Sequence, residues 1–297
     1  MKKIFAAMLA LLMIATLFSC KKEEDGDVDL DKYKQEEVVI EYVERTTVVD
    51  EATGKVETER FYFETLDTET IAITGYVGKD ATHTLKIPKE LDVSDPNDKT
   101  KTDVRTVTTI AAEAFYYCSK INAIEFPETV TTIGNYAFAG CALIQSLEIP
   151  ATVTSIGDGA FFGCTGMTSL TFAEGSALAF IGKYAFSECT GIGEVSIPAS
   201  VQEIGASAFK DCDALTTVAV AEGVKTIGDG AFIRCKKLES ITLPASVQKI
   251  GLHAFSESEA LYSDGAVAPA GSYAAAYLEE MNLSDPPIVL PDDAANQ

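Results

Sequence analysis

Residues 133–150 read IGNYAFAGCALIQSLEIP, and variants of this stretch recur along the chain. An Ala-Phe pair follows four positions after an Ile, and a Cys follows three positions after the Phe. The phenylalanines are Phe115, Phe138, Phe161, Phe186, Phe209, Phe232 and Phe255. The cysteines are Cys118, Cys141, Cys164, Cys189, Cys212 and Cys235, at intervals of 23, 23, 25, 23 and 23 residues. A fixed period of this kind indicates a structural repeat rather than a disulfide framework.

Each repeat contains two short strand signals. Leu147 and Ile149 alternate with polar residues before Pro150, which predicts a strand that places alternate side chains in a core and ends at the proline. A Val three positions before the Ile, such as Val130 or Val153, marks the second strand. No single repeat can bury its apolar residues alone. We therefore predict a solenoid whose parallel strands form one continuous sheet.

The repeat resembles that of the BspA-like leucine-rich repeat family of bacterial surface lipoproteins, over about residues 104–262. The resemblance implies an N-terminal β cap over residues 36–103 and a helical cap in residues 263–297. We expect strands at 37–43 and 56–63, joined by a turn over 50–55, with an exposed loop over 92–101. Ser272 is the expected N-cap of the C-terminal helix. An independent small β domain over residues 36–103 is the alternative.

Positions that differ from the repeat pattern lead to further structural predictions. The stretch from 173 to 181 is two residues longer than its counterparts, so a bulge is expected there. Ser258 replaces the Cys of the last repeat, which suggests that this repeat faces more water. The glycine that usually follows the Ile is expected to permit a tight turn. The six cysteines should be buried thiols without disulfides, because their Cβ vectors run parallel.

The first residues resemble a bacterial lipoprotein leader. Residues 1–19 form a signal peptide with Lys2 and Lys3 before an uncharged stretch, and the stretch from Leu17 leads to Cys20, the candidate lipidation site. An ordinary signal peptide with an incidental Cys is the alternative. Residues 20–35 form an acidic tether, which resembles that of surface-displayed outer-membrane lipoproteins. We expect display on the cell surface, with a periplasmic location as the alternative.

Catalytic and metal motifs are weak. The spacing of four acidic residues is similar to that of an EF-hand calcium loop: Asp25, Asp27, Asp29 and Glu36. Leu30 occupies the position where that loop needs Gly, so we favour a solvated tether. Glycine pairs at 157/159 and 228/230 lack the lysine of a phosphate loop and recur with the repeat. His253 occupies a variable turn position, and no acid or nucleophile is identified beside His83. We expect no metal, no cofactor and no catalysis.

The composition and net charge limit the classes of partner that the chain can bind. The chain carries 23 Lys and Arg against 45 Asp and Glu, a net charge of −22, which repels nucleic acid and anionic lipid. A monomer that meets the membrane only through its lipid anchor is expected. With 47% apolar residues in 297, the chain can bury a substantial core.

The outward strand positions form the candidate binding face. One column contains Ala123, Ser146, Ser169, Glu194, Thr217 and Ser240, and the other contains Glu125, Glu148, Thr171, Ser196, Ala219 and Thr242. The leading hypothesis is a non-catalytic surface protein that binds a protein or glycan. The family resemblance implies adhesion, including adhesion to host extracellular-matrix proteins. A structural envelope scaffold without an external ligand is the alternative, and an enzyme that uses His83 or His253 is a third hypothesis.

Overall fold

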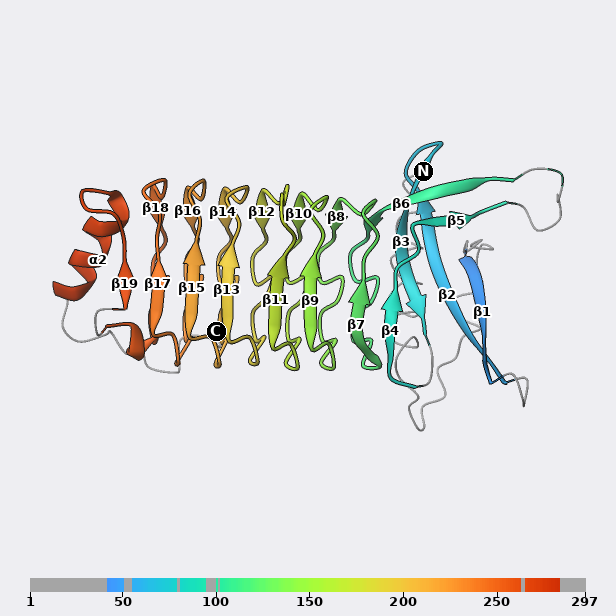
Figure 1. Ribbon diagram of the computed structural model, residues 1–297, viewed down its shortest axis with the longest axis horizontal. Coiled ribbons are helices and arrows are strands. Elements are labelled where there is room, and N and C mark those ends of the chain that lie inside the picture. The colour runs from blue at the N-terminus through green and yellow to red at the C-terminus, as the bar shows by residue number, and fades with distance from the viewer. Residues whose placement is uncertain are drawn as a thin grey trace, which may run out of the picture.

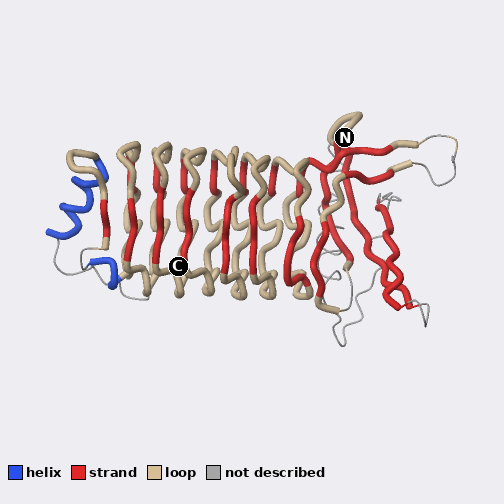
Figure 2. Tube along the Cα trace, viewed as in Figure 1, coloured by secondary structure: helices blue, strands red, loops and turns tan. Residues whose placement is uncertain are grey.

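The computed structural model describes residues 42–50, 55–78, 81–94, 100, 102–262 and 265–283. Figure 1 shows a row of stacked coils with long strands at the N-terminal end and a helix at the other end. Short strands succeed one another along the row, and turns join them along both edges (Figure 2). The predicted repeat solenoid is therefore confirmed.

Six strands come before β7, with which the regular series of coil strands begins: β1 (Tyr42–Asp50), β2 (Lys55–Thr65), β3 (Thr70–Val77), β4 (His83–Lys86), β5 (Glu90–Asp92) and β6 (Val104–Ile110). β1 and β2 form an antiparallel hairpin in which Asp50 lies opposite Lys55. The strand expected over 37–43 falls largely outside the described residues. The strand observed is Tyr42–Asp50, whose later part is rich in β-branched Thr and Val.

The hairpin continues into the solenoid. β3 is antiparallel to β2 and parallel to β6, with Ile73 opposite Ile110, and β5 lies antiparallel to β6. Phe61 and Ile73 belong to the same buried core as Phe115 of the first coil. The residue boundaries of the segments, 36–103 and 104–262 among them, stay predictions.

Each coil contributes strands to two series. The first series is β7 (Ile121–Glu125), β9 (Ser146–Ile149), β11 (Ser169–Phe172), β13 (Glu194–Ile197), β15 (Thr217–Val220), β17 (Ser240–Thr242) and β19 (Ala266–Val267). The second series is β8 (Thr132–Ile133), β10 (Ser155–Ile156), β12 (Phe180–Ile181), β14 (Glu203–Ile204), β16 (Thr226–Ile227) and β18 (Lys249–Ile250).

The two series differ in continuity. The second continues β6 in an 11-stranded sheet, whereas the first forms two four-stranded sheets, β11-β9-β7-β4 and β13-β15-β17-β19. The single continuous sheet expected from sequence is therefore divided between β11 and β13. Gln145, Thr168 and Thr216 each donate a backbone hydrogen bond to the preceding coil. Gly193 stands at this position just before β13, and glycine supports strand pairing poorly.

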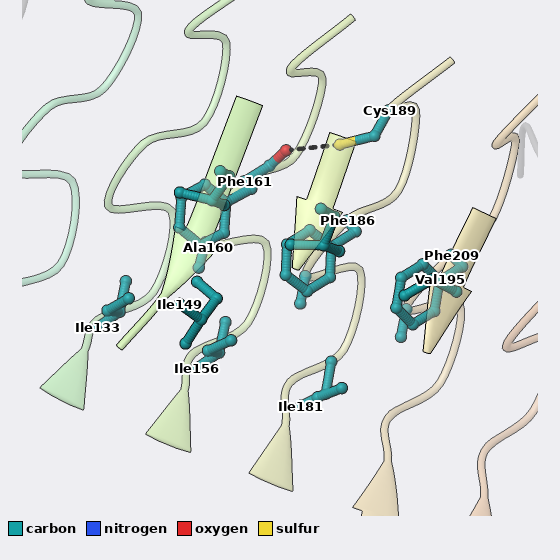
Figure 3. Packing of buried hydrophobic residues seen from close by; sticks show 14 of the residues in the cluster. Ile133, Ile149, Ile156, Ala160, Phe161, Ile181, Phe186, Cys189, Val195 and Phe209 are labelled. Atoms are coloured by element: carbon teal, nitrogen blue, oxygen red, sulfur yellow. Dashed lines mark hydrogen bonds between the residues drawn. The ribbon is translucent and has the colours of Figure 1, made fainter. Parts of the chain in front are cut away.

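The seven phenylalanines form a continuous stack, which we call the Phe ladder. All seven are fully buried, and neighbouring rings lie 4.8 to 5.8 Å apart, within 14° of parallel. Figure 3 shows Phe161, Phe186 and Phe209 in successive coils. Because each ring rests on the rings of its neighbours, no coil completes its core without the adjacent coils.

The segment around each ladder phenylalanine is a turn that bonds to the next coil. We call it the arc, from two residues before the Phe to the Cys. The positions two before and two after the Phe have left-handed backbone, as in Tyr136 (φ 53°) and Gly140 (φ 73°). The amides of Tyr136, Phe138 and Gly140 donate to carbonyls of the next coil at 2.7 to 2.8 Å. The arcs thus form a third line of hydrogen bonds between coils.

The glycine that follows six of the seven repeat Ile residues is needed for space. A Cβ built on Gly182 would lie 2.5 Å from the carbonyl carbon of Gly157 and 2.7 Å from the amide nitrogen of Asp158. Its φ is not left-handed, so close contact between coils is the reason for the glycine rather than the tight turn expected from sequence.

The cysteines hold neighbouring coils together through hydrogen bonds. The Cys189 thiol donates to the Phe161 carbonyl oxygen at 3.2 Å (Figure 3), and the same contact recurs from Cys141 to Cys235. None of the six described cysteines forms a disulfide, as expected. Ser258 donates in the same way to the Phe232 carbonyl oxygen at 3.1 Å and is fully buried. The expectation that the last repeat faces more water is therefore wrong at Ser258, because the hydroxyl takes over the thiol's bond.

Both ends of the Phe ladder are covered by tyrosines. Tyr76 of β3 lies 5.3 Å from Phe115, and Tyr277 lies 6.3 Å from Phe255, as ring centroids. Tyr277 belongs to α2 (Tyr273–Leu283), which follows the short 3-10 helix η2 (Glu259–Tyr262) and β19. Ser272 accepts a hydrogen bond from the Ala275 amide at 3.1 Å, which confirms the expected N-cap. In the longer coil, the two extra residues, Ser176 and Ala177, follow the exposed turn at Glu174 and Gly175 and precede buried Leu178, within the stretch where a bulge is expected.

Candidate ligand-binding surface

The two predicted columns lie side by side on the outer face of the first strand series. Strand pairing places Ala123, Ser146 and Ser169 in one row, and places Glu148 beside Thr171. Beyond the division, the rows are Glu194, Thr217, Ser240 and Ser196, Ala219, Thr242. The structure therefore brings the candidate residues together as two adjoining patches. Their role in binding stays a prediction.

The first patch begins with an ion pair. Lys86 Nζ lies 3.0 Å from Glu125 Oε2, and both side chains are more than half exposed. An exposed pair of this kind contributes little to stability, so its charges remain available to a partner. The remaining outward positions are small and polar, which makes this face flat and poor in the aromatic side chains that dominate most interfaces.

His83 has partners that the sequence analysis missed. Tyr76 Oη donates to Glu59 Oε1 at 2.6 Å and lies 2.9 Å from His83 Nε2, and His83 Nδ1 lies 2.9 Å from the Ala81 carbonyl oxygen. A carbonyl oxygen only accepts, so His83 Nδ1 carries a proton. The signal in the sequence was Glu59, a charged residue on the same strand face as buried Phe61 and Phe63.

This polar group joins three strands of the cap. Glu59 comes from β2, Tyr76 from β3 and His83 from β4. The side chains of His83 and Glu59 are only 9% and 11% exposed. Such burial makes the cluster a connection within the cap and leaves little access for a substrate.

The other candidates for chemistry are inaccessible or isolated. Burial raises the pKa of the Cys235 thiol to about 12, and burial likewise raises the pKa of Cys212. A neutral thiol is a poor nucleophile. His253 is an exposed arc residue with φ 56°, and its Nδ1 lies 3.2 Å from Ser256 Oγ.

The described residues were searched for metal sites and for membrane-spanning helices. Within them, no group of three or more His, Cys, Asp or Glu is arranged to hold a metal ion. Among the same residues, no helix has the length and apolarity needed to cross a bilayer. Cys20 and the acidic residues from Asp25 to Glu36 lie outside the described part of the chain.

Sequence reasoning also missed an exposed group of tyrosines on the arcs. Tyr117, Tyr136 and Tyr184 are 55%, 39% and 41% exposed. Tyr116 stacks edge-on against Tyr117, with ring centroids 4.5 Å apart. The signal was their place at arc positions that hold glycine in other coils, such as Gly159 and Gly163.

Solved structures share this fold. A T. pallidum leucine-rich repeat protein is 29% identical, with a TM-score of 0.58 over 68% of this chain and 87% of that one. A leucine-rich cell surface protein from Faecalibacterium prausnitzii is 27% identical, with a TM-score of 0.58 over 70% of this chain and 52% of that one. This chain thus spans about half the length of the second protein. No curated protein matches the chain in sequence.

The repeats themselves match a described family. The BspA type leucine rich repeat region matches in six copies, over residues 100–179 and 175–263. These ranges include more than half of the chain and nearly all of the coils described above. The chain therefore belongs to the BspA-type leucine-rich repeat family.

Proposed function

We propose that this chain is a lipid-anchored protein of the cell surface that binds a protein or glycan partner and performs no catalysis. The observation that carries the proposal is the Phe ladder. Seven stacked coils hold the outward side chains at a fixed spacing, which suits the binding of an extended partner over several coils. The net negative charge of this chain favours partners with cationic or neutral surfaces.

Two further points support the proposal. The F. prausnitzii relative is itself described as a cell surface protein. The Cys20 sequence supports anchoring through a lipid, which leaves the coils free to face a partner. The outward columns from Ala123 to Thr242 are the binding face that we assign from sequence, and adhesion to extracellular-matrix proteins belongs to this proposal.

Anchoring is tested with detergent partitioning of the whole protein. The chain should enter the detergent phase, and Cys20→Ser should move it to the aqueous phase, because the thiol is the acceptor of the lipid. Ser19→Ala keeps a small residue before the Cys and is the matched control. Equal partitioning of Cys20→Ser and the parent chain would refute anchoring at this residue.

Display is tested by protease treatment of intact and lysed cells. Cleavage on intact cells is expected for a surface protein. Protection until lysis would refute surface binding and favour the envelope-scaffold alternative. An array of extracellular proteins and glycans then tests binding, with loss of all binding as the outcome that contradicts the proposal.

A further inference from the structure

The arcs form a surface distinct from the strand columns. Their left-handed positions direct side chains outward in two rows, one on each side of the buried Phe ladder. Tyr136 and Tyr184 stand in the row before the phenylalanine, two coils apart, and Tyr117 stands in the row after it. At the usual spacing of paired strands, two coils separate equivalent positions by about 10 Å.

Two of these rings lie across glycines of the next coil. A Cβ built on Gly140 would lie 2.6 Å from Tyr117 Cδ1, and one built on Gly159 would collide with the Tyr136 ring. Each ring therefore packs against the bare backbone of the next coil, while 55% of Tyr117 and 39% of Tyr136 remain open to solvent. An aromatic ring that is held in place and exposed to this extent can serve as a stacking platform.

Polar groups surround the rings. Burial raises the pKa of Tyr116, and Tyr117, Glu113 and Tyr136 raise it further, which places these four side chains in one neighbourhood. Glu113 and Glu188 are exposed at arc positions of the same surface and offer carboxylate acceptors. The surface thus combines ring faces with hydrogen-bond acceptors.

We propose that the arc surface around Tyr117, Tyr136 and Tyr184 binds an extended, neutral, β-1,4-linked glycan by stacking sugar rings on the tyrosines. The inference rests on the proposed binding function and assigns its glycan ligand to the arcs, a second surface beside the outward columns. Sugar rings present flat C–H faces to aromatic rings and hydroxyls to carboxylates. Equivalent ring faces recur once per disaccharide in such a glycan, a length that spans about two coils.

The surroundings favour a glycan over a protein or an anionic polymer. The arc between those of Tyr136 and Tyr184 carries Gly159 and Gly163 at its left-handed positions, so half-buried Phe162 is the large apolar side chain that it adds, a small area for the buried centre of a protein interface. The net charge of −22 repels anionic polysaccharides. A neutral sugar polymer needs no large apolar centre and is not repelled by the negative charge.

The test is calorimetric titration of the whole chain with cellohexaose and chitohexaose. Maltohexaose, whose α-linkage curls the chain, is the control for geometry. Tyr117→Gly and Tyr136→Gly remove the rings and keep the left-handed backbone, because the next coils carry glycine at these positions. Phe180→Ala, which removes a half-exposed ring from the second strand series, is the matched control.

We expect binding of at least one β-linked probe, weaker binding of maltohexaose, and a loss of about tenfold in affinity for each glycine variant. Phe180→Ala should bind as the parent does. Absence of binding to both β-linked probes would overturn the inference, and the extracellular-protein array then decides separately whether the proposed function fails with it. Binding that survives both glycine variants would place the glycan elsewhere and would also overturn the assigned site.

Discussion

The Phe ladder predicts a sharp contrast between two nearby phenylalanines. Phe186 is fully buried, and its ring stacks on Phe161 at 5.4 Å and on Phe209 at 5.3 Å. Phe186→Ala removes the ring and leaves a cavity between two coils, so the free energy of unfolding should fall by about 3–5 kcal/mol. Phe180, six residues earlier, is 50% exposed, and Phe180→Ala should change it by no more than about 0.5 kcal/mol.

Urea unfolding followed by far-UV circular dichroism measures both values. Hydrogen exchange adds a spatial readout, because the cavity should reduce amide protection in the coils of Phe161 and Phe209 more than in the distant coil of Phe115. Similar losses from Phe186→Ala and Phe180→Ala would refute the reasoning that stacking of the ladder holds the coils together. A loss of protection that is uniform along the chain would refute the idea that each coil is stabilised mainly by the two coils next to it.

Three further outcomes follow from the contacts between coils. Burial raises the pKa of the Cys235 thiol from 9.0 to about 12, so its contribution to stability is complete below pH 9 and is lost as the pH rises toward 12, by up to about 1.4 kcal/mol per pH unit. Urea unfolding across that range, compared with Cys235→Ser, measures the slope, and equal slopes would contradict it. Gly182→Ala should lower the free energy of unfolding by about 2 kcal/mol because the new methyl meets backbone, whereas Gly193→Ala meets no atom within 4 Å and should be neutral or stabilising in the same assay. Cys189→Ser should be more stable to urea than Cys189→Ala by about 1 kcal/mol, since only the serine can still donate to the Phe161 carbonyl, and the reverse order would argue against that hydrogen bond.

The buried core of the coils was predictable because its positions require apolar side chains, and these recur with the period of the repeat. Each ladder phenylalanine and each Cys sits at a position where apolar character and period decide the outcome. Leu178, in the longer coil, lies three residues before its Ile as Val153 does in the preceding coil, and it is fully buried there. Ser258 was misjudged because residue type alone does not reveal a hydrogen bond to a carbonyl in another coil.

The arcs were harder to predict, because backbone contacts shape them. Glutamate, tyrosine, serine, aspartate, arginine and histidine all occupy left-handed positions there, so no glycine pattern marks the turn. The partners of His83 were equally hidden, since Glu59 and Tyr76 lie on the β2–β3 pair whereas His83 lies on β4, which pairs with β7 in another sheet, and both pairings contain register shifts. Pairing of this kind depends on bulges that local propensity does not specify.

The same regularity explains why the tyrosines point to function. A left-handed residue other than glycine costs about 1 kcal/mol or more, and the arcs in several coils avoid that cost with glycine. Tyr136 recovers part of the cost by packing its ring against Gly159, but 39% of the residue stays exposed to water. Folding alone gains nothing from an exposed aromatic face. Because glutamate, serine, aspartate, arginine and histidine share these left-handed positions, strain belongs to the arcs in general, and it is the exposed rings of Tyr117, Tyr136 and Tyr184 that set their coils apart and that the proposed glycan would use.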